Sequence, residues 1–158
     1  MTDLIKTRLL IIFMLAFFIV DPASAQSTAF PASIIAGNPT VQDFQLVTNR
    51  NHASILIDEQ DYPIVKLCAG LFRDDVERIT GYKPLLTTNQ TEAIPYCVII
   101  GSIECSRIIK KLISDRKIDV SGIKGKWESC LTQTVDNPLP GIEKALVIAG
   151  SDRRGTAY

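Results

Sequence analysis

The spacing of apolar residues predicts a long amphipathic helix in the first half of the chain. Apolar side chains recur at three- and four-residue steps and share one helical face, namely Ile64, Val65, Cys68, Leu71, Phe72, Val76 and Ile79. Asp61 is the expected N-cap, and Gly81 followed by Pro84 marks the expected end. Gly70 lies inside the helix, where glycine costs about 1 kcal/mol relative to alanine. We therefore expect Gly70 to allow close packing against a sheet.

Strand patterns occur on both sides of this helix. Phe44 to Thr48 alternates between apolar and polar residues, and Ala53 to Ile57 is a second apolar run after a turn-forming segment at 49–51. These two runs predict a β-hairpin. Leu85 to Thr88 is a candidate short strand, and Tyr96 to Gly101 is a continuous apolar run typical of a strand buried on both faces.

The second half of the chain continues the alternation of helices and strands. Ser102 is the expected cap of a helix whose apolar face comprises Cys105, Ile108, Ile109, Leu112 and Ile113. Trp127 to Val135 alternates like a strand, 137–141 supplies a turn, and Ala145 to Ala149 is another doubly buried strand. Ser151 has the character of the N-cap of a last helix.

The order of these elements predicts an α/β fold, a small mixed-sheet α/β sandwich over residues 44–158. The 158 residues suffice for one domain, and the hydrophobic share of 46% suffices for its core. Lys plus Arg equals Asp plus Glu at 17 each. Because a neutral chain is not attracted to nucleic acid or to an anionic membrane surface, neither is an expected partner.

Residues 1–25 have the three parts of a secretory signal peptide. Basic residues come first, Leu9 to Val20 is an unbroken apolar run, and Ala23-Ser24-Ala25 matches a cleavage site. As a helix this run rises about 18 Å, which is too short for a hydrocarbon core of about 30 Å. We expect cleavage after Ala25, a secreted or periplasmic mature chain without a stable membrane anchor, and a lead-in segment at 26–43.

The four cysteines, Cys68, Cys97, Cys105 and Cys130, do not form a metal-binding pattern. No C-x-x-C occurs, and no histidine stands at zinc-ligand spacing. We interpret them as small buried apolar residues, and a single disulfide is the alternative in an exported chain. Neither a metal nor a cofactor is expected.

Residues that commonly carry enzymatic chemistry do not form a recognisable set. No phosphate-binding glycine motif follows Gly101-Ser102, and His52, the single histidine, is expected at the surface. A glycosidase needs two carboxylates about 5 to 9.5 Å apart across the substrate, and no pattern marks such a pair. The acidic clusters are expected on solvated faces; they are Asp58, Glu59 and Asp61, and Asp74, Asp75 and Glu77. We therefore expect no catalytic residue in this chain.

One segment near the C-terminus conflicts with local rules. Ser151 and Asp152 suit the start of a helix, but Arg153 and Arg154 follow in the first turn, where cations are disfavoured. Such a conflict often marks a site that serves something outside the local structure. The site would be either an anion-binding corner for a uronic acid carboxylate or a salt bridge to a neighbouring domain, and we favour the second.

Five blocks of the sequence form a recognisable series. They are DDVERITG at 74–81, VIIG at 98–101, GKWES at 125–129, NPLPG at 137–141 and ALVIAGSDRRGTAY at 145–158. Together they resemble the N-terminal region of glycoside hydrolase family 115, the xylan α-1,2-glucuronidases. The last block is the most specific, because its length and its arginine pair match the family pattern.

The resemblance implies a secreted, multidomain and often dimeric enzyme. Family members remove glucuronic acid or its 4-O-methyl ether from xylan side chains, with inversion at the anomeric carbon. Their small N-terminal α/β sandwich precedes a (β/α)₈ barrel, which carries the catalytic carboxylates. We expect this chain to stop before the barrel, so that Tyr158 is an unnatural end. It would be an accessory domain, inactive alone, whose partners are its own catalytic barrel, xylan and a second copy.

Two alternatives remain open. A stand-alone carbohydrate-binding or interaction module would need an exposed aromatic platform, and the one Trp, four Tyr and six Phe form no clustered stripe. An N-terminal domain from another barrel glycosidase, such as a hexosaminidase or another α-glucuronidase family, is the other alternative. The SDRRGTAY segment argues against it.

Overall fold

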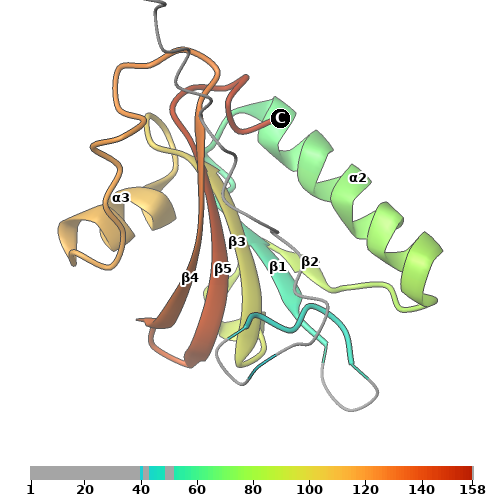
Figure 1. Ribbon diagram of the computed structural model, residues 1–158. Helices are drawn as coiled ribbons and strands as arrows, with labels where there is room; N and C mark the ends of the chain where they lie inside the picture. The colour runs from blue at the N-terminus through green and yellow to red at the C-terminus, as the bar shows by residue number, and fades with distance from the viewer. Residues whose placement is uncertain (1–39, 41–42, 49–51, 158) are drawn as a thin grey trace, which may run out of the picture. The chain divides into compact units, whose positions relative to one another are not determined.

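A five-stranded mixed sheet lies between two helices in the computed structural model, which describes residues 40, 43–48 and 52–157 (Figure 1). The predicted signal peptide and most of the lead-in segment at 26–43 lie outside the described residues. The elements are β1 (Ser54–Ile57), α2 (Pro63–Thr80), β2 (Leu86–Thr87), the 3-10 helix η2 (Gln90–Glu92), β3 (Tyr96–Ser102), α3 (Arg107–Ser114), β4 (Cys130–Leu139) and β5 (Ile142–Gly150).

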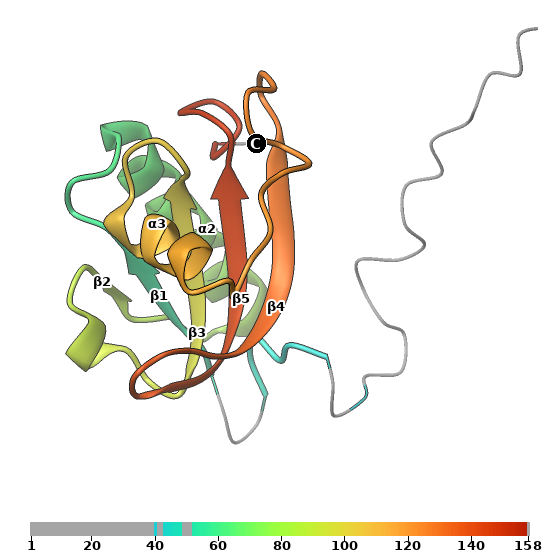
Figure 2. The same cartoon turned by 90° about the vertical axis from the view of Figure 1, so that its left-hand side faces the viewer.

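The strand order is β2-β1-β3-β5-β4. The first four strands of that order run parallel, and β4 pairs antiparallel with β5 at the edge. The helix α2 covers one face of the sheet and α3 covers the other (Figures 1 and 2). The mixed-sheet α/β sandwich expected from the sequence is therefore confirmed. No described helix is long and apolar enough to cross a bilayer.

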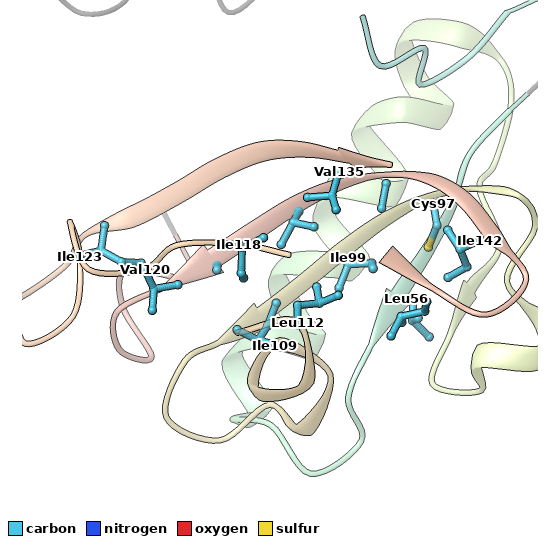
Figure 3. Close-up of a cluster of buried hydrophobic side chains, with 14 residues drawn as sticks. Leu56, Cys97, Ile99, Ile109, Leu112, Ile118, Val120, Ile123, Val135 and Ile142 are labelled. Carbon is cyan, nitrogen blue, oxygen red and sulfur yellow. The ribbon is translucent and has the colours of Figure 1, made fainter. Parts of the chain in front are cut away.

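Each face of the sheet has its own apolar core. Because successive side chains in a strand alternate between faces, Ile55 and Ile57 of β1 pack with α2, whereas Leu56 packs toward α3. On the α3 side, Ile109 and Leu112 lie against Ile99 of the central strand β3 (Figure 3). Val98 and Ile100 of the same strand pack in the core on the α2 side, so burial of both faces explains why the run at 96–101 is continuously apolar.

The apolar stripe of α2 is wider than the face that the sheet covers. Val65, Ala69 and Val76 are buried, but Leu71 is 57% exposed and Ile79 is 82% exposed, so both predictions of burial are wrong. The expected N-cap is also wrong by one residue. Tyr62 holds that position without a side-chain cap, because Pro63 begins the helix and has no N–H to satisfy.

Gly70 does not lie against the sheet, contrary to expectation. A Cβ built there would have no atom within 4 Å, and its backbone angles are not in the left-handed region. We therefore expect Gly70→Ala to stabilise the domain by about 0.5–1 kcal/mol, because alanine restricts the unfolded chain more than glycine does. Chemical denaturation of both proteins measures this. Gly81→Ala is the matched control, which should destabilise since Gly81 ends α2 with φ of 73°. A loss of stability in Gly70→Ala would contradict the assignment of open space.

The predicted hairpin at 44–57 is present only as a single antiparallel bridge. Val47 and His52 form an isolated antiparallel bridge, and β1 pairs in parallel with β2 and β3 instead. A central position for β1 buries Ile55 and Leu56 completely, which a local hairpin would not. The residues before the bridge still contribute to the apolar core, because Phe44 and Leu46 pack against it on the α2 side.

Two element boundaries also differ from expectation. Ser106, not Ser102, caps α3, and its Oγ accepts a hydrogen bond from the Ile109 N–H at 3.2 Å. The strand β4 begins at Cys130 rather than Trp127 and continues through most of the predicted turn at 137–141. Chain reversal occurs at its end, where Gly141 has φ of 84°, a conformation that favours glycine.

The four cysteines differ in their surroundings and are free. Cys97 is fully buried, and burial raises the pKa of its thiol to about 11, as expected for a small apolar core residue. Cys68 and Cys105 are half-buried. Cys130 is exposed in the edge strand, so the expectation of burial is wrong there.

Candidate functional site

The GKWES block meets the GSDRRG segment of the last block, residues 150–155, where β4 begins and β5 ends. The Ser151 N–H donates to the Ser129 carbonyl at 2.8 Å, and the Ser129 N–H donates to Ser151 Oγ at 3.0 Å. The Glu128 N–H donates to Asp152 Oδ2 at 3.0 Å. We call residues 127–129 and 151–155 the corner. It joins segments that are far apart in the sequence into one hydrogen-bonded unit.

Asp152 organises the corner. Besides Glu128, the backbone N–H groups of Arg154 and Gly155 donate to its carboxylate, at 2.8 and 2.7 Å. Hydrogen bonds from Glu128, Gly155 and Arg154 lower the pKa of this carboxyl, so it is ionised at neutral pH. The described residues after Ser151 form turns rather than the predicted helix. The Ser151 hydroxyl accepts a hydrogen bond from the Ser129 N–H and does not cap a helix.

The two arginines have different environments. Arg154 forms an ion pair with Glu128, with Nε 2.9 Å from Oε1, and its guanidinium lies 5.6 Å from the ring centroid of Trp127. Arg153 is exposed and has no ion pair or hydrogen bond within the described part of the chain. The structure therefore brings Asp152 and Arg154 together and leaves Arg153 available. Their role in substrate or interdomain contact stays a prediction.

Backbone conformation also distinguishes the corner. Glu128 has φ of 52°, in the left-handed region that residues other than glycine seldom adopt. Strained residues of this kind persist where surrounding contacts fix them, and they concentrate at functional positions. Here the ion pair and the N–H bond to Asp152 fix Glu128 and place the neighbouring Trp127 at the surface. Trp127 is 75% exposed.

A cavity of about 570 Å³ opens beside the corner. Its volume falls in the range of about 300–1,000 Å³ that is typical of small-molecule sites. An apolar wall, an exposed tryptophan and charged groups of both signs line it; the residues are Ile103, Glu104, Ile113, Val120, Lys124, Gly125, Lys126, Trp127, Ser151 and Asp152. The sequence indicated only its Ser151 and Asp152 side, as a candidate anion-binding corner, and gave no indication of the cavity itself or of the exposed Trp127.

A second polar cluster lies where helices leave the sheet on opposite faces, between the ends of β1 and β3. Asp58 and Asp61 come from the acidic loop that was expected to be solvated, but they are only 4% and 8% exposed. Asp58 accepts hydrogen bonds from the Arg107 N–H at 2.6 Å and from Arg107 Nη2 at 2.7 Å. Asp61 accepts from the N–H and Oγ of Ser102, at 2.7 and 2.6 Å. The expectation of solvation is wrong because these partners lie on α3 and β3.

This second cluster is structural rather than ligand-binding. In open α/β sheets, the crevice at such a reversal of strand order commonly binds a ligand. Here both oxygens of each carboxylate already accept hydrogen bonds within the protein, those of Asp58 from Arg107 and those of Asp61 from Ser102. The cavity beside the corner is therefore the better candidate site.

The Asp58 ion pair predicts a dependence of stability on acid. Arg107 and backbone N–H groups lower the pKa of Asp58 from 3.8 to about 2, and its side chain is 1% exposed, so solvent screens it little. The ionised pair contributes about 2 kcal/mol, all of it present above pH 3.8 and lost as the pH falls through about 2. The midpoint of thermal denaturation, measured as the pH is lowered from 3.8 to about 2, should fall less steeply in Asp58→Asn than in the original chain. Parallel curves would contradict this.

The remaining acidic residues and the histidine are at the surface or half-buried. Glu77 forms an exposed ion pair with Lys83, and Asp74 and Asp75 form exposed pairs with Arg73 and Arg78, as the expectation of solvation requires. His52 is half-buried, with its ring centroid 3.9 Å from that of Tyr82. Among the described residues, no group of three or more His, Cys, Asp or Glu side chains is placed to hold a metal ion.

The fold and the corner define an α/β sandwich domain with a candidate site at the carboxyl ends of its parallel strands. No family model and no curated protein matches the chain. A solved structure does: a family GH115 4-O-methyl-α-glucuronidase, BtGH115A, with specificity for decorated arabinogalactans. The TM-score is 0.51 and the sequence identity 26%. The resemblance to an N-terminal domain of glycoside hydrolase family 115 is therefore confirmed by this structural match.

The extent of the similarity is uneven between the two proteins. The match covers 67% of this chain but 12% of the glucuronidase chain. This chain is thus similar to one part of a much larger glycoside hydrolase.

Proposed function

We propose that this chain is the N-terminal accessory domain of a secreted glycoside hydrolase that removes glucuronic acid or 4-O-methylglucuronic acid side chains from xylan, with inversion. The observation that carries the proposal is the 26% identity, in a shared fold, to a family GH115 4-O-methyl-α-glucuronidase. Because that enzyme is specific for decorated arabinogalactans, glucuronidated arabinogalactan is the alternative substrate of the parent enzyme.

The proposed role is to cover one side of a catalytic barrel. The flank of α2 that the sheet leaves uncovered supports a docking role, since Leu67 and Leu71 are 58% and 57% exposed one helical turn apart. The buried carboxylates support inactivity of the domain by itself. Asp58 and Asp61 are held by Arg107 and Ser102, so they are unavailable as a glycosidase pair.

The test compares this chain with the product of its reading frame extended past the Tyr158 codon. Each protein is incubated with glucuronoxylan and with glucuronidated arabinogalactan, and released uronic acid is quantified by anion-exchange chromatography. We expect release by the extended product, with the inverted anomer visible by proton NMR, and none by the 158-residue chain. A stop codon directly after Tyr158, or an extended product inactive on both polymers, would overturn the proposal.

A stand-alone carbohydrate-binding module is the second candidate. The exposed Trp127 at the mouth of a cavity of about 570 Å³ favours it, because it supplies an aromatic surface that the sequence did not reveal. A stop codon after Tyr158 together with sugar binding by the 158-residue chain would favour this candidate.

A further inference from the structure

We infer that the cavity beside the corner binds an acidic sugar, with Trp127 as the stacking surface and Lys124 and Lys126 as partners of the sugar carboxylate. The inference rests on the proposed function for the choice of a uronic acid, and it adds a sugar-binding site within this domain itself.

The tryptophan is prepared for stacking. The Arg154 guanidinium lies over the Trp127 ring at 5.6 Å, and Glu128 fixes that arginine through an ion pair of 2.9 Å. One face of the indole therefore has a fixed partner, and a ligand would take the opposite face. The C–H groups on one side of a pyranose ring form an apolar surface that suits an aromatic face. Trp127 is 75% exposed, so such a ligand would remove a large apolar area from water.

The walls of the cavity provide an apolar surface and hydrogen-bond acceptors for the remaining parts of a sugar ring. Ile103 and Ile113 provide an apolar wall. Asp152 presents an ionised carboxylate that three backbone N–H groups hold in place. Glu104 also lines the cavity, and its Oε2 accepts a hydrogen bond from the Tyr62 hydroxyl at 2.7 Å, which orients it. Oriented carboxylates are suitable acceptors for sugar hydroxyl groups.

The two lysines favour an acidic sugar over a neutral one. Lys124 and Lys126 line the cavity on either side of Gly125 and are exposed. Their backbone N–H groups donate to the Val120 and Ile123 carbonyls, but neither ammonium group makes an ion pair or hydrogen bond with another described residue. An ammonium group without a protein partner is available to a carboxylate at C6 of the ring, the group that distinguishes glucuronic acid from glucose.

The single tryptophan makes this site directly observable. The chain contains one Trp and four Tyr, so emission excited at wavelengths beyond the tyrosine absorption band reports Trp127 alone. Titration with 4-O-methylglucuronic acid should give a saturable change in emission. Methyl glucoside, which has a similar ring without the carboxylate, should bind about tenfold more weakly. An absence of saturation, or equal binding of the two sugars, would overturn the inference.

Variants separate the carboxylate contact from stacking. Lys126→Met should weaken uronic acid binding about fivefold while leaving methyl glucoside binding unchanged, as expected for one exposed charge contact. Lys110→Met is the matched control, because Lys110 is an exposed lysine on α3 that does not line the cavity. Trp127→Ala should abolish binding of both sugars. Because this variant has no tryptophan, its binding is measured by titration calorimetry. Equal losses in Lys126→Met and Lys110→Met, with unchanged circular dichroism, would contradict the assignment of the carboxylate partner.

The two proposals fail separately. If the extended product releases uronic acid but the 158-residue chain shows no sugar-dependent fluorescence change, only the sugar site in this domain is wrong. If the fluorescence titration saturates but the extended product releases no uronic acid, the glycosidase parent is wrong, and a binding module is the remaining function.

Discussion

Gly155→Ala should destabilise the domain by about 3 kcal/mol, because the corner leaves no room for a Cβ at this position. A Cβ built on Gly155 would overlap the backbone carbonyl oxygen and nitrogen of Ser129. Gly155 is buried, and its φ is not in the left-handed region, so close packing alone requires glycine here. A backbone obstacle cannot move aside as a flexible side chain can. The change would therefore separate the GSDRRG segment from the GKWES segment.

Gly122→Ala is the matched control for this change. Gly122 is exposed, has no atom within 4 Å of a built Cβ, and does not require a left-handed conformation. Its replacement should alter the free energy of unfolding by no more than about 0.5 kcal/mol. Urea denaturation of the three proteins measures the effect, with Trp127 fluorescence as a local reading of the corner. Similar small changes in both variants would show that the Ser129–Gly155 contact is not tight.

Continuous apolar runs made the central strands predictable from the sequence. The continuous apolar run at 96–101 and the run at 145–149 correspond to β3 and β5, which are adjacent and parallel in the sheet. Such runs are required where helices cover both faces of a sheet. The Gly81 end of α2 was predictable for a similar reason, since a left-handed residue after a helix strongly favours glycine.

Long-range partners explain most of the errors. A loop of acidic residues is normally solvated, and nothing near Asp58 or Asp61 in the sequence suggests otherwise. Their partners are Arg107, which is 49 residues after Asp58, and Ser102, which is 41 residues after Asp61. The pairing of β1 was missed for the same reason. A local pattern indicates that a strand forms, but its neighbours depend on the arrangement of the whole sheet.

The candidate site was predictable only in part. The conflict between Asp152 and the arginines after it pointed to the segment that forms part of the corner, but the helix expected there is wrong, since the described residues form turns. Trp127 was expected to begin a strand, whereas β4 begins at Cys130 and Glu128 before it has a positive φ. A positive φ at a glutamate has no sequence signal, because it results from the contacts with Asp152 and Arg154.

Asp61→Ala should cost about 3 kcal/mol, because it leaves a buried backbone donor without a partner. Ser102 ends the central strand β3 and is fully buried, with its N–H donating to Asp61 at 2.7 Å and its hydroxyl at 2.6 Å. Asp61 also accepts from the Tyr62 N–H at 2.8 Å, just before α2 begins. The carboxylate thus joins the end of β3 to the start of α2. Its loss would affect two elements together.

Asn at the same position separates hydrogen bonding from charge. Asp61→Asn keeps one acceptor oxygen but places an N–H₂ group opposite a donor, so we expect about half of the alanine effect. Glu59→Ala, an exposed change in the same loop, should alter stability by no more than about 0.5 kcal/mol. The Ser102 amide hydrogen should also exchange with solvent faster in Asp61→Ala than in the original chain, since that N–H loses its acceptor. Unchanged exchange there, or equal effects of the Asp61 and Glu59 variants, would show that water replaces the carboxylate at little cost.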